Sequence, residues 1–242
     1  MTEQRTDRSV GGLLRQWRKR RRLTQLEVSL RANVSARHLS FVETGRAKPS
    51  REMIVHLAEE LDVPLRKRNE LLLAGGFAPS YTERPLDSPE LSAVRSAVRH
   101  VLAGHEPNPA VAVDRYWNMV DANRAIGLLT VNVDPELLEP PANVLKASLH
   151  PAGLAPRIVN IGEWRAHLLH RLRRQVTATA DPELAALYDE LSELPCEAPE
   201  PAAEAPEPDA IGATLRIRHD DRDLTFFSTV TVFGTPHDIT VA

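Results

Sequence analysis

Apolar residues recur at helical spacing from Ser9 onward through the first third of the chain, and short polar breaks interrupt them. Ala-Gly-Gly at residues 74–76 then stops the last helix, and Pro79 adds a further break. The pattern predicts an all-α N-terminal domain of five helices over residues 9–78. A linker is expected at residues 79–88.

Helical and strand-like stretches are mixed in the remainder of the chain. Helices are predicted at 89–103, 122–129, 142–149, 162–176 and 182–194. A strand or a hairpin is predicted at 110–120, and strands are predicted at 214–217, 224–232 and 239–241. The acidic, proline-rich residues 195–208 cannot bury a core and are expected to form a mobile loop. Residues 89–242 are therefore predicted to form one α+β domain.

Charge is divided unevenly between these two parts. Residues 1–82 hold 16 Lys and Arg against 9 Asp and Glu, whereas the other residues hold 14 against 24. The basic part suits contact with a polyphosphate, and the acidic part does not. The single cysteine, Cys196, permits no intrachain disulfide, and no apolar stretch has the length for export or membrane spanning. We therefore expect a cytoplasmic protein without a membrane span.

Residues 23–45 (LTQLEVSLRANVSARHLSFVETG) contain the residue types that two closely crossing helices require at their contact and in the turn between them. Ser29 supplies a small side chain at the crossing, and Asn33 tolerates a positive φ in the turn between the helices. The stretch therefore predicts a helix-turn-helix, whose second helix enters the major groove of DNA.

Capping residues stand at the starts of both of these helices. Thr24 with Glu27 is a predicted capping box, and Ser35 is a predicted cap of the second helix. Helix N-termini that face DNA can hold phosphate oxygens through their free N–H groups, and Gln25 adds a side-chain donor. These residues are expected to position the protein on the DNA backbone.

The outer face of the second helix is expected to read bases. Leu39 and Val42, three residues apart, can point inward. Most of the outer face is then formed by Ala36, Arg37, Ser40 and Phe41. Arg37 can hydrogen-bond the edge of a guanine, or it can contact a phosphate instead. An exposed Phe41 can contact the methyl group of a thymine. The full set of predicted DNA contacts is Arg22, Thr24, Gln25, Ser35, Ala36, Arg37, Ser40, Phe41, Thr44 and Arg46.

Two neighbouring features have a plainer interpretation. The basic run at residues 18–22 (RKRRR) can be a solvated face, although its place two residues before a capped helix favours phosphate contact by some of it. Trp17 lies in helical register with Leu13 and Leu14, which favours core packing over stacking on nucleic acid.

Residues 9–74 resemble the phage-repressor helix-turn-helix superfamily, often called the XRE family. The resemblance implies a lambda-repressor-like five-helix fold, a double-stranded DNA operator as partner, and an ion pair between Arg18 and Glu43. Asn33 stands where the family usually has glycine, and Ser29 where it usually has alanine. The matching residues are Leu14, Trp17, Arg18, Leu23, Thr24, Gln25, Val28, Val34, Ser35, Leu39, Glu43, Gly45, Pro49, Ile54, Leu57, Ala58, Leu61 and Val63.

The second part carries no recognisable chemistry. It has no nucleotide loop, nucleophile signature or metal-protease helix, so no catalytic residue and no enzyme is predicted. Glu163, His167 and His170 lie on one helical stripe that could ligate zinc, but projection places them opposite the apolar face, on the solvated side. No metal site is therefore predicted.

Arg165 falls inside the apolar arc of the same predicted helix. A guanidinium there needs a partner. It can snorkel to the surface or pair with a carboxylate of the domain, or it can receive the carboxylate of an apolar ligand.

From Pro107 onward the chain resembles the ligand-binding domain of MmyB-like regulators. The resemblance implies a PAS-like α+β fold, an apolar pocket for a small, fatty-acid-like effector, and a dimer-forming surface. Trp117 and Asn123 are the expected pocket-lining residues, with ordinary core packing as the alternative for the tryptophan. The matching stretches are 116–117, Asn123, 150–151, 156–160, Trp164, 167–169, 172–174, 224–229 and 233–236.

Together these features predict a homodimeric DNA-binding transcriptional regulator without a cofactor, apart from a bound fatty acid or other apolar small molecule as effector. Two copies of the second helix would enter successive major grooves of a pseudo-palindromic operator. A rear domain that serves only oligomerisation is the first alternative, and an enzyme targeted to DNA is the second.

Overall fold

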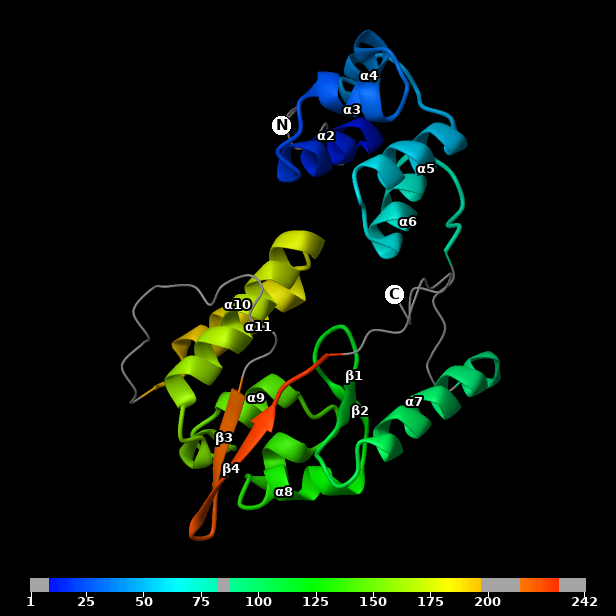
Figure 1. Cartoon of the computed structure of the whole chain (residues 1–242). Coiled ribbons are helices and arrows are strands. Elements are labelled where there is room, and N and C mark those ends of the chain that lie inside the picture. The colour runs from blue at the N-terminus through cyan, green and yellow to red at the C-terminus, as the bar shows by residue number, and fades with distance from the viewer. Residues whose placement is uncertain (1–8, 82–87, 197–213, 231–242) are drawn as a thin grey trace. The chain divides into compact units, whose positions relative to one another are not determined.

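The computed structural model describes residues 9–81, 88–196 and 214–230. They divide into two compact units, with the boundary between Ser88 and Pro89. Figure 1 labels the helices and strands of both units. Most of the predicted loop 195–208 and the predicted strand 239–241 lie outside the described residues.

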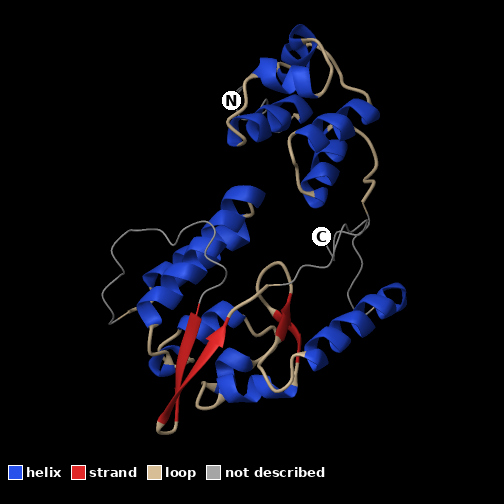
Figure 2. Cartoon of the chain, viewed as in Figure 1, coloured by secondary structure: helices blue, strands red, loops and turns tan. Residues whose placement is uncertain are grey.

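The described part of the first unit is entirely helical, and its five helices confirm the prediction (Figure 2). Four of them begin after a serine or threonine whose hydroxyl accepts an N–H of the first turn, as the capping pattern requires. The helices are α2 (Val10–Arg20), α3 (Gln25–Arg31), α4 (Ala36–Glu43), α5 (Arg51–Glu60) and α6 (Leu65–Ala74).

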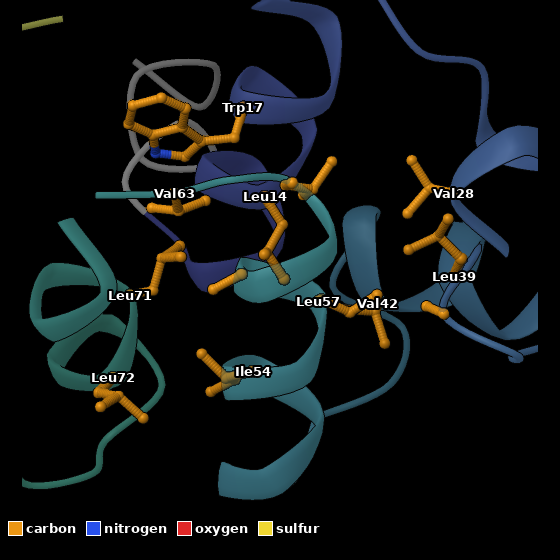
Figure 3. Packing of buried hydrophobic residues seen from close by; sticks show 13 residues of the cluster. Leu14, Trp17, Val28, Leu39, Val42, Ile54, Leu57, Val63, Leu71 and Leu72 are labelled. Carbon is orange, nitrogen blue, oxygen red and sulfur yellow. The ribbon is translucent and has the colours of Figure 1, made fainter. Parts of the chain in front are cut away.

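One apolar core joins all five helices. Figure 3 shows Leu14 of α2, Val28 of α3, Leu39 of α4, Ile54 of α5 and Leu72 of α6 as members of this core, and each is almost completely buried. Burial of these aliphatic side chains is the main favourable contribution to the fold of so small a unit.

Trp17 belongs to the same core. Its side chain is 7% exposed, which confirms the prediction of core packing. The guanidinium carbon of Arg20 lies 5.3 Å from the centroid of its ring and that of Arg21 lies 5.8 Å away, so two cations lie over the indole.

Hydrogen bonds attach Ser80 and Tyr81 to α6. Asn69 donates from its side-chain amide to the carbonyl of Tyr81 at 2.8 Å, and its Oδ1 accepts the backbone N–H groups of Ser80 and Tyr81. Ser80 and Tyr81, which lie in the predicted linker 79–88, are therefore hydrogen-bonded to α6.

The second unit combines helices with short strands, which confirms the α+β class in its coarse form. Its helices are α7 (Ser92–Gly104), α8 (Gly127–Thr130), α9 (Val144–Leu149), α10 (Ile161–Thr179) and α11 (Pro182–Glu193), with single 3₁₀ turns η1 (Pro89–Leu91), η2 (Arg124–Ile126), η3 (Pro135–Leu138) and η4 (Ala155–Arg157).

The described strands form two separate antiparallel hairpins. They are β1 (Val111–Val113) with β2 (Met119–Ala122), and β3 (Thr214–His219) with β4 (Arg222–Phe227). The second hairpin turns at Asp220 and Asp221, and Asp220 takes a φ of +50°, a conformation that aspartate tolerates in turns. Both hairpins overlap the predicted strands, although β2 continues to Ala122, where a helix was predicted, and β3 continues to His219.

The core of the second unit lies between α10, α11 and the inner face of β3. Leu172, Leu184 and Ile217 are almost completely buried in it. Within the described residues, no helix combines the length and apolar character that a membrane crossing requires.

Candidate nucleic-acid interface

The turn between α3 and α4 has the geometry that the sequence predicted. Asn33 takes a φ of +50°, and the N–H of Val34 donates to the carbonyl of Ser29 at 3.0 Å. Ser29 is only 4% exposed, and its hydroxyl donates to the carbonyl of Leu26 at 2.8 Å. A small polar side chain therefore fits at the helix crossing without an unpaired hydroxyl.

Both predicted caps are formed. The hydroxyl of Thr24 accepts the N–H of Glu27 at 3.2 Å, and the Glu27 carboxylate accepts the N–H of Thr24 at 2.7 Å, which completes the capping box. This backbone hydrogen bond, more than any other contact, lowers the pKa of the Glu27 carboxyl. At α4, the hydroxyl of Ser35 accepts the N–H of His38 at 3.1 Å.

A buried carboxylate fixes α4 to the two helices before it. Glu43 accepts Nε of Arg18 at 2.6 Å and Nη2 of Arg18 at 2.8 Å, and it also accepts Nε2 of Gln25 at 2.8 Å. The expected Arg18–Glu43 ion pair is thus confirmed, and the hydrogen bond to Glu43 raises the pKa of Arg18. One N–H of the Gln25 amide is occupied here, and the other is left for the phosphate contact that we expect.

An arginine-flanked aromatic ring occupies the outer face of α4. The guanidinium carbons of Arg37 and Arg46 lie 5.4 Å and 6.0 Å from the centroid of Phe41. Phe41 was predicted to be exposed but is half-buried, with these two cations near its ring, while both arginines are exposed. Two guanidinium groups and an aromatic edge are therefore presented together.

The remaining predicted contacts surround this face. Ala36 and Ser40 are half-buried on α4. Thr44 is exposed, and its hydroxyl donates to the carbonyl of Ser40 at 2.7 Å. Arg22 is exposed and takes a φ of +56° just before Thr24. Arg22 can therefore extend from the start of α3 without a competing contact among the described residues.

The basic run 18–22 divides into structural and exposed members. Arg21 donates from Nε to the carbonyl of Leu61 at 3.0 Å and from Nη2 to the carbonyl of Asp62 at 2.5 Å, so it caps the C-terminal end of α5. Arg18 is held by Glu43. Lys19 and Arg22 are among the exposed members, as a contact with phosphate would require.

One feature of this site was missed by the sequence reasoning. A methyl group placed on Gly11 would lie 2.1 Å from the carbonyl oxygen of Val42, so α2 and α4 approach each other too closely for a side chain there. Nothing in the local pattern distinguishes this glycine from its neighbour Gly12. The contact joins residues that are far apart in sequence, and local reasoning cannot detect it.

The predicted ligand residues of the second unit have polar atoms engaged within the fold. Nε1 of Trp117 donates to Gln175 at 2.8 Å, and the side chain of Asn123 bonds the backbone of Asn108 and Ala110. Nη2 of Arg165 donates to the carbonyl of Ser192 at 2.7 Å, at the end of α11. These bonds support positioning roles for the three residues.

A shallow surface groove of about 490 Å³ opens elsewhere in this unit, and Trp117, Asn123 and Arg165 do not line it. It lies between η3, α9 and α11, and glutamates dominate its charged lining. Its lining residues are Tyr116, Asn118, Glu136, Leu137, Glu139, Pro141, Asn143, Lys146, Glu183, Ala186, Leu187 and Glu190.

The stripe considered for zinc lies on the outer side of α10. Glu163 and His170 are exposed, and the ring of His167 stacks on Trp164 at 5.8 Å between centroids. Desolvation, and after it the charges of Arg171 and His170, lower the pKa of His167. Among the residues that the structure describes, no group of three or more His, Cys, Asp or Glu side chains could hold a metal ion.

Comparison with known families agrees with this division into a helical first unit, called the head below, and a second unit, called the rear domain. Residues 14–67 match the helix-turn-helix family, and residues 94–242 match the family described as the MmyB-like transcription regulator ligand binding domain. The chain belongs to this family. No curated protein matched the chain. An XRE-type helix-turn-helix in front of a ligand-binding domain supports a DNA-binding transcription regulator.

Proposed function

We propose that this MmyB-like regulator binds its operator as a homodimer and reads bases with the outer face of α4. The observation that carries the proposal is the group of Arg37, Phe41 and Arg46, which combines two exposed guanidinium groups with an aromatic edge on one face. Arg37 stands in the first turn of α4, the part of a recognition helix that meets base edges.

The capped helix starts supply the positioning contacts in this proposal. Thr24 and Ser35 fix the first turns of α3 and α4, and Gln25 is held against Glu43 beside the first of them. Together with Arg22 and Thr44, they would bind phosphate oxygens and set the register of α4 in the groove.

The rear domain would bind a small-molecule effector and transmit its presence to the operator contact. The family match over residues 94–242 supports a ligand-binding role. A PAS-like arrangement and an apolar, fatty-acid-like effector are finer parts of the proposal and rest on the resemblance of the sequence motifs. Differential affinity of the effector for two dimer geometries would alter DNA binding.

Substitution of Arg37 by alanine tests the base-reading role. We expect the ratio of operator affinity to nonspecific DNA affinity to fall by about tenfold or more, because a bidentate guanidinium contact contributes about 1–3 kcal/mol of base discrimination. Fluorescence anisotropy with operator and scrambled duplexes at several salt concentrations measures both affinities.

The exposed Arg15 of α2 provides a matched control, since Arg15→Ala removes the same charge from outside the predicted contact set. It should leave the specificity ratio unchanged. Arg37→Ala could instead weaken binding to both duplexes equally and reduce by about one the slope of log affinity against log salt concentration. Arg37 would then contact phosphate, and the base-reading assignment would be wrong.

A further inference from the structure

Four side chains that carry or can carry positive charge form a stripe along α10. His167, His170, Arg171 and Arg174 follow one another at spacings of three, one and three residues, which places them on one face of the helix. We call this set the α10 cationic stripe. His170 and Arg174 are exposed, and His167 and Arg171 are half-buried.

The stripe lacks a carboxylate partner within the described part of the chain. Arg171 lies over the ring of Trp117 at 5.1 Å and His167 stacks on Trp164, so both rest on aromatic rings instead of on acids. Glu163 stands at the N-terminal end of the same face, where it accepts a hydrogen bond from Asn160 at 3.1 Å. Burial lowers the pKa of His167 most, and the neighbouring charges of Arg171 and His170 lower it further.

A surface of opposite charge lies on the same unit. The groove between η3, α9 and α11 carries Glu136, Glu139, Glu183 and Glu190. The only basic residue of its lining, Lys146, pairs with Glu190 at 2.7 Å. The other three glutamates are exposed and have no ion-pair partner among the described residues. We call these four glutamates the acidic groove.

We propose that the α10 cationic stripe of one copy docks on the acidic groove of a second copy. Because each copy carries both surfaces, a twofold arrangement forms the contact twice and closes on itself. The inference rests on the homodimer of the proposed function and names the surfaces that would build it.

Charge favours a second copy over DNA as the occupant of the stripe. The chain beyond residue 82 holds 14 Lys and Arg against 24 Asp and Glu, so the stripe is set in a domain that duplex DNA repels as a whole. A second copy offers unpaired glutamates to the stripe, and its own stripe complements the first copy's groove.

Charge reversal on each surface in turn tests the docking. Full-length Arg171→Glu/Arg174→Glu carries two acidic surfaces, and full-length Glu136→Lys/Glu139→Lys carries two basic ones. Each variant alone should dimerise about tenfold more weakly than the wild type, or worse, at low salt. An equimolar mixture should recover dimers, since both contacts of the mixed pair again join opposite charges. Sedimentation velocity gives the dissociation constants, and native mass spectrometry identifies the mixed dimer.

Arg124→Glu serves as a single charge-reversal control, because Arg124 is exposed on η2 outside both surfaces. It should dimerise like the wild type, and circular dichroism of all variants checks that they fold. The docking is refuted if the reversed variants dimerise normally, if they lose only DNA affinity, or if their mixture stays monomeric. A wild type that is monomeric up to high concentration would refute the homodimer itself, which is a separate failure.

Discussion

Glu43 is the residue on which the geometry of the recognition helix depends most directly. Its side chain is 2% exposed and is bound by Arg18 from α2 and by Gln25 from α3. A buried carboxylate of this kind is stable only while its donors remain, because desolvation of an unpaired charge is costly. The pair therefore specifies the position of α4 more than it adds net stability.

Removal of Arg18 should show how far the first unit depends on the donors of Glu43. We expect Arg18→Met to lower the free energy of unfolding of the first unit by about 3 kcal/mol, since it leaves the Glu43 carboxylate buried with only the Gln25 donor. Hydrogen–deuterium exchange of the α2 and α4 amides measures the opening of this unit within the full chain.

The surface pair of Lys67 with Glu70, at 2.6 Å, provides the comparison for this prediction. Lys67→Met also removes a cation from an ion pair, but the Glu70 side chain is 49% exposed and remains hydrated. This substitution should lower the free energy of unfolding by less than about 1 kcal/mol. Equal effects of the two substitutions would contradict the assignment of a special role to Glu43.

At the scale of elements, the close crossing of α2 and α4 sets the fold of the head. Gly11 permits this crossing, since a methyl group there would lie 2.1 Å from the carbonyl oxygen of Val42. Backbone atoms cannot yield as a flexible side chain can, so the two helices would have to separate.

Gly11→Ala is therefore expected to destabilise the first unit by about 1–3 kcal/mol, although alanine favours helices. Gly104→Ala in α7 is the matched control, because a methyl group there meets nothing within 4 Å and should be neutral or stabilising. Amide exchange in each unit records both effects, and a neutral Gly11→Ala would show that the crossing is less tight than described.

Elements whose cause is local could be predicted from the sequence, and contacts between distant segments could not. The capping box of Thr24 with Glu27 and the positive φ of Asn33 depend on neighbouring residues, and both were predicted. Arg21 instead caps α5 from forty residues away, and Arg165 bonds the end of α11. Such partners are fixed by tertiary packing, which no single-segment pattern contains.

At the scale of the whole molecule, the two units carry opposite charge and different chemistry. The head has an excess of basic residues and carries the outer face of α4, whereas the rear domain has an excess of acidic residues and matches the ligand-binding family. Affinity for DNA phosphates should therefore come from the head, and regulation from the rear domain. Base reading by the outer face of α4 is the first requirement of this function, because without it the protein has no operator to regulate.

Selection of bound duplexes from a random-sequence pool by the purified full-length protein tests that claim most directly. A dimer that places two copies of α4 in successive major grooves should enrich a pseudo-palindromic sequence, with half-site centres about 10 base pairs or a multiple of that apart. Enrichment should disappear with Arg37→Ala. A pool that stays random after selection by the wild-type protein would contradict the account.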